Sequence, residues 1–217
     1  MKYLIPIYLW FCIISCQQKK AAIETTTQDT TKIVPLPEVT NDYLITDTSF
    51  GKINRTTVLS DLENLFGKQN IQDTINYGAE GMDSFIVTKV FSNTAKEITI
   101  GWRQDQLHKK IASVEIYQTG SPYYTTDSIM IGSILEKLLQ VNGKKINFYG
   151  TEWDYGGTIT SYNKGKFDRS NIFFTLNGKK DMSEKLLGDR EFNTDLPLVK
   201  SNLKKLYISS ITLSLHK

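Results

Sequence analysis

Cysteine and histidine are scarce in this sequence. Among its 217 residues there are 2 cysteines and 2 histidines. Cys12 and Cys16 both lie near the start of the chain, so the remainder has no thiol for a disulfide bond or a redox reaction. His108 and His216 are far apart, and neither has a cysteine or a second histidine at the spacing of metal ligands. The composition therefore gives no support for a metal site, and we expect no cofactor.

Catalytic fingerprints and concentrated charge are also missing. The sequence contains no Gly-x-Ser-x-Gly elbow, no phosphate-binding loop and no dinucleotide fingerprint. Its formal net charge is +3, from 26 Lys and Arg against 23 Asp and Glu. No cluster concentrates the basic residues, so nucleic acid is not an expected partner. The chain does have 11 Tyr and 10 Phe, residues that favour strands and hence a sheet-rich fold.

The first sixteen residues have the features of an export signal. Lys2 gives a short positive region, and the apolar run Tyr3–Ile14 is too short to span a bilayer as a permanent helix. The segment Ile13–Cys16 resembles the lipobox of bacterial lipoproteins, in which a branched apolar residue and a small residue precede the lipidated cysteine. We therefore predict that residues 1–15 are a signal peptide and that Cys16 carries a fatty-acid anchor such as palmitate. The alternatives are an ordinary secretory signal or an uncleaved apolar N-terminus.

Residues 16–42 lack apolar periodicity. They are rich in threonine, and Pro35 and Pro37 prevent regular ladder hydrogen bonding, so this stretch cannot bury enough surface to fold. As a flexible coil of about 26 residues it would span roughly 25–30 Å. We predict a disordered tether that holds a folded domain away from a membrane. Residues 17–20 lack the acidic run that resembles a surface-export signal, which favours an outer-membrane position facing the periplasm.

The rest of the sequence combines strand patterns with two helical patterns. It divides into two α+β blocks, residues 43–120 and residues 121–217. The predicted helices cover 55–66 and 133–141. The predicted strands cover 43–46, 84–91, 97–103, 110–117, 128–131, 146–149, 157–162, 172–176 and 206–215. These patterns indicate an α+β fold, with antiparallel sheet or sheets that carry helices on one face.

The two blocks follow the same order of strand, helix and meander, which predicts two tandem repeats. Their ends match best, since Ile111–Ile116 is spelled much like Ile208–Leu213. A chance match within an α+β chain is the alternative, and one continuous sheet or two small layers would both fit. In the second block, Ser133 and Glu136 have the spacing of a capping box, and Gly143 is placed for a left-handed helix cap.

The stretch 142–167 is dense in glycine and aromatic residues. It contains Asn142-Gly143-Lys144-Lys145, Phe148-Tyr149-Gly150, Trp153-Asp154-Tyr155-Gly156-Gly157-Thr158 and Ser161-Tyr162. This succession resembles a pattern in uncharacterised lipoproteins of Bacteroidota-type bacteria, and it covers about 26 of the 217 residues. The chain has Lys145 and Tyr162 where that pattern often has Pro and Trp. The resemblance implies no activity.

Glu152 and Asp154 form a close acidic pair framed by aromatic residues. On a strand, residues two apart face the same side, which would place the two carboxylates roughly 6–7 Å apart. Such a pair would suit acid–base work on a glycoside or would supply two oxygen ligands to calcium. The interpretation that we favour is structural. Asp154 would hydrogen-bond the backbone of a turn in which Gly156 and Gly157 supply positive φ.

Two classes of function follow from these patterns. The leading hypothesis is a cell-envelope lipoprotein whose tethered α+β domain binds an envelope protein or a glycan without catalytic machinery. The alternative is an enzyme acting on envelope glycan or peptide, with Glu152 and Asp154 as acid and base. Aromatic side chains near that pair could stack on sugar rings or grip a peptide, although aromatics at strand positions are more often core or cross-strand pairs. The candidate ligand-binding residues are Tyr149, Glu152, Trp153, Asp154, Tyr155 and Tyr162.

The lipid anchor can be tested directly. We expect Cys16→Ser to abolish labelling by a fatty-acid analogue and to leave a soluble or unprocessed species on fractionation, because the acylated thiol is gone. Cys12→Ser is the matched control and should keep full labelling, since cleavage removes Cys12. Equal labelling of the Cys16→Ser variant and the wild type would contradict the prediction.

Overall fold

The computed structural model describes residues 41–78 and 83–216. The predicted signal peptide, Cys16 and nearly all of the predicted tether lie outside these residues. All the described residues belong to one unit of the chain, residues 39–217, and only this unit is described below. No helix among the described residues is both long enough and apolar enough to cross a membrane.

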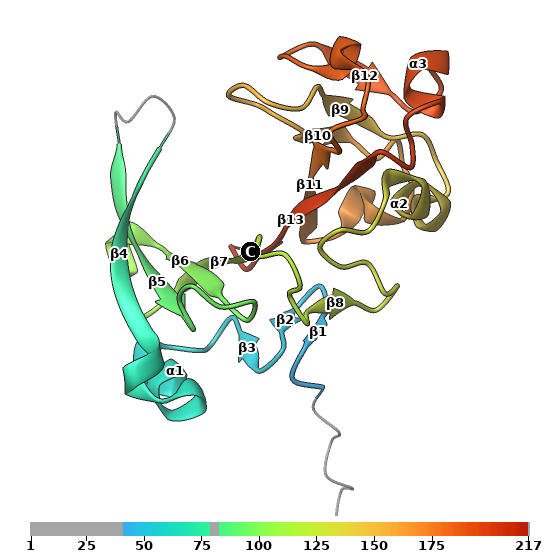
Figure 1. Cartoon of the computed structure of the whole chain (residues 1–217). Coiled ribbons are helices and arrows are strands. Elements are labelled where there is room, and N and C mark those ends of the chain that lie inside the picture. Colours follow the sequence, from blue (N-terminus) through green and yellow to red (C-terminus); the bar gives the residue numbers. More distant parts are fainter. Residues whose placement is uncertain (1–40, 79–82, 217) are drawn as a thin grey trace, which may run out of the picture. The chain divides into compact units, whose positions relative to one another are not determined.

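A six-stranded antiparallel sheet forms the centre of the unit (Figure 1). Its strand order is β11-β13-β7-β6-β5-β4, so the end of the first block pairs with the end of the second. The strands are β4 (Ile71–Tyr77), β5 (Ser84–Val90), β6 (Ile98–Trp102), β7 (Ile111–Ile116), β11 (Ile172–Gly178) and β13 (Leu206–Ser214). Of the two arrangements that the sequence leaves open, the structure has the continuous one at this junction.

Alternating side chains give the central sheet one apolar face. Ile100, Val114 and Leu213 are paired across β6, β7 and β13, and all three are fully buried. Leucines from the helices α1 (Leu59–Phe66) and α2 (Leu135–Asn142) join the same core. The paired residues on the opposite face are mostly polar, as expected for an antiparallel sheet that is covered on one side.

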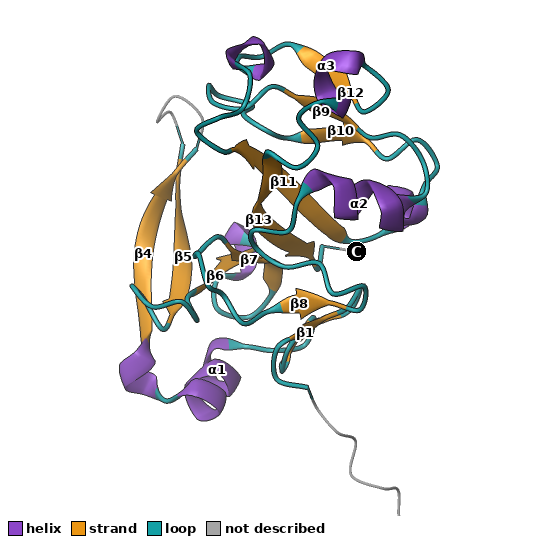
Figure 2. Ribbon diagram, turned by 45° about the vertical axis from the view of Figure 1, so that its right-hand side comes forward, coloured by secondary structure: helices purple, strands orange, loops and turns teal. Residues whose placement is uncertain are grey.

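Two smaller sheets complete the architecture (Figure 2). The four-stranded sheet has the order β3-β2-β1-β8, and the three-stranded sheet has the order β10-β9-β12. Their strands are β1 (Leu44–Ile45), β2 (Ser49–Phe50), β3 (Ile53–Asn54), β8 (Tyr124–Thr125), β9 (Asn147–Tyr149), β10 (Ile159–Ser161) and β12 (Glu191–Asn193). A third short helix, α3 (Pro197–Lys200), precedes β13. The predicted α+β class, with antiparallel pairing dominant, is therefore confirmed.

The tandem repeat stays a prediction, but two pairings agree with it. In the sheet centre Glu115 pairs with Thr212, and these are the corresponding positions of the two matched segments. In the four-stranded sheet β1 and β8 pair in parallel, Leu44 with Tyr124. These two strands begin similarly spelled segments, Tyr43–Thr48 and Tyr123–Ser128, which share Tyr, Thr and Asp at the same positions.

The first helix begins later than predicted, at Leu59 instead of residue 55. The residues before it form a turn in which polar side chains satisfy the backbone: Thr57 Oγ1 accepts from the N–H of Asn54 at 3.0 Å, and Asn54 Oδ1 accepts from the N–H of Thr56 at 2.9 Å. Such local bonds compete with helix formation.

The predicted capping box of the second helix is wrong. Ile134 occupies the N-cap position, and Ser133 Oγ accepts from the N–H of Met130 at 3.0 Å instead of from the helix. The N–H of Glu136 donates to the carbonyl of Leu203, which is distant in the sequence. The predicted C-cap is confirmed, since Gly143 has φ 70° and ψ 2°.

The strand assignments also need correction, and the short strands β2, β3, β8 and β12 have no counterpart among the predicted ones. The segment 128–131 is not a strand: residues 125–129 form a turn in which Thr125 Oγ1 accepts from the N–H of Ile129 at 3.2 Å. Conversely, β4 was not expected. It is an edge strand in which Ile75 and Tyr77 are largely exposed. Pairing with β5 stabilises this strand, and its sequence therefore shows only a weak apolar pattern.

Asn142 ties the second helix to its surroundings. Its side chain is 3% exposed and makes three bonds to backbone groups. Nδ2 donates to the carbonyls of Lys144 at 2.8 Å and Tyr162 at 3.0 Å, and Oδ1 accepts from the N–H of Phe167 at 3.3 Å. One buried amide therefore satisfies backbone groups just after α2, just after β10 and in the 3-10 turn Lys166–Arg169.

We expect Asn142→Ala to lower the free energy of unfolding by about 2–4 kcal/mol, because it leaves buried backbone groups unsatisfied. Gln140→Ala is the matched control on the exposed side of α2 and should change stability by less than about 0.5 kcal/mol. Urea unfolding measures both values. Equal stability of the two variants would show that Asn142 does not hold these segments together.

Candidate functional site

Glu152 and Asp154 do not lie on a strand. Residues 152–156 form a turn, in which Glu152 and Trp153 have left-handed φ values of 65° and 69°. The strand spacing that would align the two carboxylates therefore does not apply, and that expectation is wrong. Both side chains are exposed, and neither carboxylate accepts a hydrogen bond from another described residue.

The turn is held by backbone bonds at its base. Gly157 N donates to Gly150 O at 2.9 Å, and Gly150 N donates to Arg190 O at 3.0 Å. Gly157 has φ 73° and Gly156 has no positive φ, so positive φ is confirmed at one of the two glycines. The expected bond from Asp154 to the turn backbone is absent among the described residues. Asp189 Oδ1 instead accepts weakly from the N–H of Tyr155, at 3.4 Å.

The four predicted aromatic residues separate into two environments. Trp153 is 76% exposed and Tyr155 is 61% exposed, and the Tyr155 ring lies 5.7 Å from the ring of Tyr149. Tyr162 is buried in the core beside Phe167, and burial raises the pKa of its phenol. The structure therefore brings Tyr149, Trp153 and Tyr155 into one region and places Tyr162 elsewhere.

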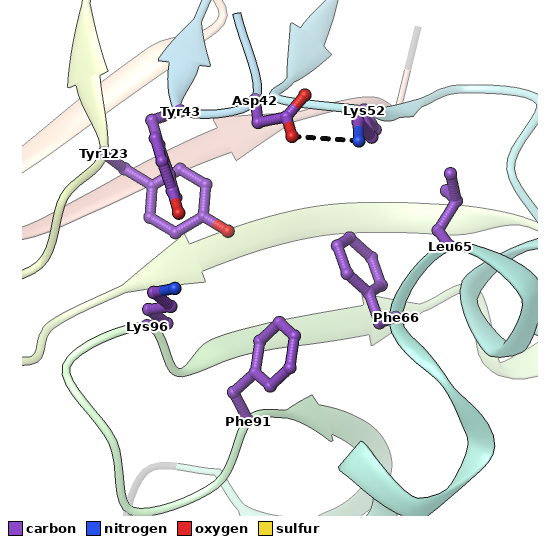
Figure 3. A pocket seen from close by; sticks show the side chains of 8 residues that line it. All are labelled: Asp42, Tyr43, Lys52, Leu65, Phe66, Phe91, Lys96 and Tyr123. Carbon is purple, nitrogen blue, oxygen red and sulfur yellow. Dashed lines mark ion pairs between the residues drawn. The ribbon is translucent and has the colours of Figure 1, made fainter.

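A pocket of about 180 Å³ lies at another place, next to the start of the described chain (Figure 3). We call it the aromatic pocket. Its lining residues come from the two positions before β1, the β2–β3 turn, the end of α1, the β5–β6 loop and the residue before β8. They are Asp42, Tyr43, Lys52, Leu65, Phe66, Phe91, Lys96 and Tyr123.

Ring contacts build the walls of the aromatic pocket. Tyr43 and Tyr123 meet edge to face at 5.3 Å, and Phe50 supports Tyr123 from the core at 5.0 Å. Phe66 and Phe91 meet edge to face at 5.7 Å on the other side. Such pairs have favoured geometries, so the walls are fixed before any ligand enters.

The hydroxyl of Tyr123 is a polar group in the wall of the aromatic pocket. Tyr123 is 3% exposed, yet its hydroxyl has no hydrogen-bond partner among residues 41–78 and 83–216. Figure 3 shows that hydroxyl directed toward the middle of the pocket. Burial raises the pKa of the phenol far above its usual value, with smaller contributions from Tyr43 and Asp42. The group is therefore a neutral O–H that can donate into the pocket.

Two lysines and one carboxylate lie at the rim. Lys52 Nζ pairs with Asp42 Oδ2 at 2.9 Å. Lys96 Nζ lies 5.9 Å from the centre of the Tyr43 ring and has no carboxylate partner among the described residues. The aromatic pocket thus carries one cation more than it has anions.

The β5–β6 loop holds Phe91 and Lys96 in place. Phe91 has φ 55°, a strained value for a bulky residue, and such strain persists only where the surroundings impose it. Here the N–H of Phe91 donates to Asn70 O at 2.8 Å, and the N–H of Asn93 donates to buried Glu97 Oε2 at 2.6 Å. The loop geometry is therefore determined by the fold.

Sequence reasoning missed this site because its lining comes from separate segments. A partial signal exists in the two similarly spelled segments that begin at Tyr43 and Tyr123, whose tyrosines form one wall. Among the described residues, no three His, Cys, Asp or Glu side chains lie close enough together to hold a metal ion.

Comparison with known proteins adds little. No family model matches the chain, and no curated protein matches it. A crystal structure of the uncharacterized protein yfeY from Escherichia coli is similar, with a TM-score of 0.44 and 13% sequence identity, covering 78% of this chain and 98% of that one. A likeness at that level says nothing about the activity of this chain.

The glycine turn can be tested with a matched pair of variants. Gly157 and Gly143 have nearly equal φ, 73° and 70°. A Cβ on Gly157 would lie 1.8 Å from Leu176 O, whereas a Cβ on Gly143 meets nothing within 4 Å. We expect Gly143→Ala to cost about 1 kcal/mol from φ alone and Gly157→Ala to cost about 3 kcal/mol or more. Thermal unfolding measures the difference, and equal melting temperatures would contradict it.

Proposed function

We propose that this chain is a lipid-anchored protein of the cell envelope whose folded unit is a non-enzymatic binding module, with the aromatic pocket as its ligand site. The anchor and the tether are inferred from residues 1–42, and the site is inferred from the geometry of the folded unit. The proposal places the module on the periplasmic side of the outer membrane. The tether leaves it free to meet soluble molecules of that compartment.

The observation that carries the proposal is the unpartnered hydroxyl of Tyr123. The Tyr123 ring is buried, and its hydroxyl lines the pocket (Figure 3) without a hydrogen-bond partner among the described residues, so it can donate to a molecule that enters. The hydroxyl also points into a space walled by four aromatic rings. A concave, mostly apolar site with a few convergent polar groups is the usual form of a small-molecule site.

The exposed turn that carries Trp153 and Tyr155 gives weaker support for a binding site. Its aromatic side chains project into solvent and do not enclose a space. The carboxylates of Glu152 and Asp154 are not held in any fixed orientation by the described residues. Acid–base catalysis needs positioned groups, so this pair supplies no argument for the enzyme alternative.

A neutral ring probe tests the proposal. We expect benzyl alcohol to shift the amide NMR signals of residues that line the aromatic pocket in a saturable way. The dissociation constant should be of millimolar order, because a ligand of this size makes few contacts. The same spectra contain an internal control, since binding at the exposed turn would shift the signals of Trp153 and Tyr155 instead.

The set of residues whose NMR signals shift also defines the result that overturns the proposal. Saturable shifts around Phe66, Phe91 and Tyr123 support the aromatic pocket as the site. Shifts confined to the exposed turn, or no saturable shift at a concentration well above the expected dissociation constant, refute it.

A further inference from the structure

The charges around the aromatic pocket restrict the ligands that it can accept. Lys52 is neutralised by Asp42 at 2.9 Å, which leaves Lys96 without a carboxylate partner among the described residues. A cationic ligand would have to approach this amine and would be repelled. Aromatic cages that bind quaternary ammonium groups attract the cation through ring faces. The Lys96 amine beside these rings therefore makes a cationic ligand unfavourable in this pocket.

The polar groups point to an acceptor on the ligand. The phenol of Tyr123 is kept protonated by burial, which raises its pKa, and has no hydrogen-bond partner among the described residues, so its O–H can donate to an acceptor on a ligand. The amine of Lys96 is a donor as well and has no acceptor capacity. A carboxylate accepts from both donors, and hydrogen bonds to an ionised acceptor are stronger than neutral ones.

The size of the aromatic pocket sets the apolar part of the ligand. An engineered cavity of about 150 Å³ is large enough to bind benzene, and this pocket has about 180 Å³. Phe66 and Phe91 lie across the pocket from the tyrosines (Figure 3). One six-membered ring with a short substituent fills such a space, whereas a fused ring system or a long acyl chain exceeds it.

We infer that the aromatic pocket binds a small aromatic carboxylate, with the ring between the aromatic walls and the carboxylate toward the Tyr123 hydroxyl and the Lys96 amine. The inference rests on the proposed function and specifies the ligand class of the same site. The single excess cation at the rim matches the one anionic group of such an acid, and the Tyr123 hydroxyl can donate to that group.

Three probes of equal length separate charge from shape. They are 3-phenylpropionate, 3-phenylpropanol and 3-phenylpropylamine, each titrated into the purified chain and followed by amide NMR shifts at low ionic strength. We expect the acid to bind about tenfold more tightly than the alcohol, because its acceptor is charged. The amine should bind more weakly than the alcohol.

Two variants assign the preference to named groups. Lys96→Met should lower the affinity for the acid about tenfold and leave the affinity for the alcohol within about twofold. Lys109→Met removes the same charge outside the pocket and is the control, with no expected change. Tyr123→Phe keeps the ring contacts to Tyr43 and Phe50, so it should fold, and should lower the affinity for the acid about tenfold.

The outcomes distinguish the inference from the proposed function. Equal binding of acid and alcohol, tighter binding of the amine, or an unchanged acid affinity in both pocket variants overturns the carboxylate inference, while a ring that still maps to the pocket leaves the proposed function standing. If no ring probe shifts the pocket signals, both fall. A preference for the acid that is lost in Lys96→Met and retained in Lys109→Met supports both.

Discussion

The pairing of β7 with β13 is the contact on which the rest of this fold depends. Four registered pairs, from Ile116 with Ile211 to Ser113 with Ser214, join the last strand of each block in the centre of the sheet. Without this pairing, each block would have a short sheet with an open edge. With it, Val114 and Leu213 lie side by side on one apolar face, and the leucines of α1 and α2 can enter a common core.

The aromatic pocket depends on a second meeting of the two blocks. The parallel pairing of β1 with β8 sets Tyr43 beside Tyr123, although the two residues are far apart in the sequence. The pocket then opens between this seam and the end of α1. The rings of Tyr43 and Phe50 pack against the Tyr123 ring, whose hydroxyl faces the pocket (Figure 3). The position of this hydroxyl is thus a consequence of how the two blocks join.

Much of the fold can be predicted from the sequence, because the alternation of apolar and polar residues in a strand is a local pattern. Three of the strands in the first block, β5 to β7, lie within a residue or two of their predicted bounds. β6 and β7 largely alternate apolar and polar side chains, and β5 is a short run rich in β-branched and aromatic residues. The strand β4 was missed because its edge position leaves Ile75 and Tyr77 exposed. The sequence leaves a strand open at residues 152–156, because the side-chain types of Glu152 and Trp153 do not reveal their left-handed φ values.

The sequence by itself determined the α+β class, the left-handed cap at Gly143 and the positive φ at Gly157, because these depend on neighbouring residues. It also carries the predicted signal and lipid anchor at Cys16, which the described structure does not reach. Only the tertiary structure decided which residues form the aromatic pocket. Its lining is contributed by segments whose distances are set by strand register and helix packing, and no local pattern encodes where Tyr123, Phe66 and Lys96 meet.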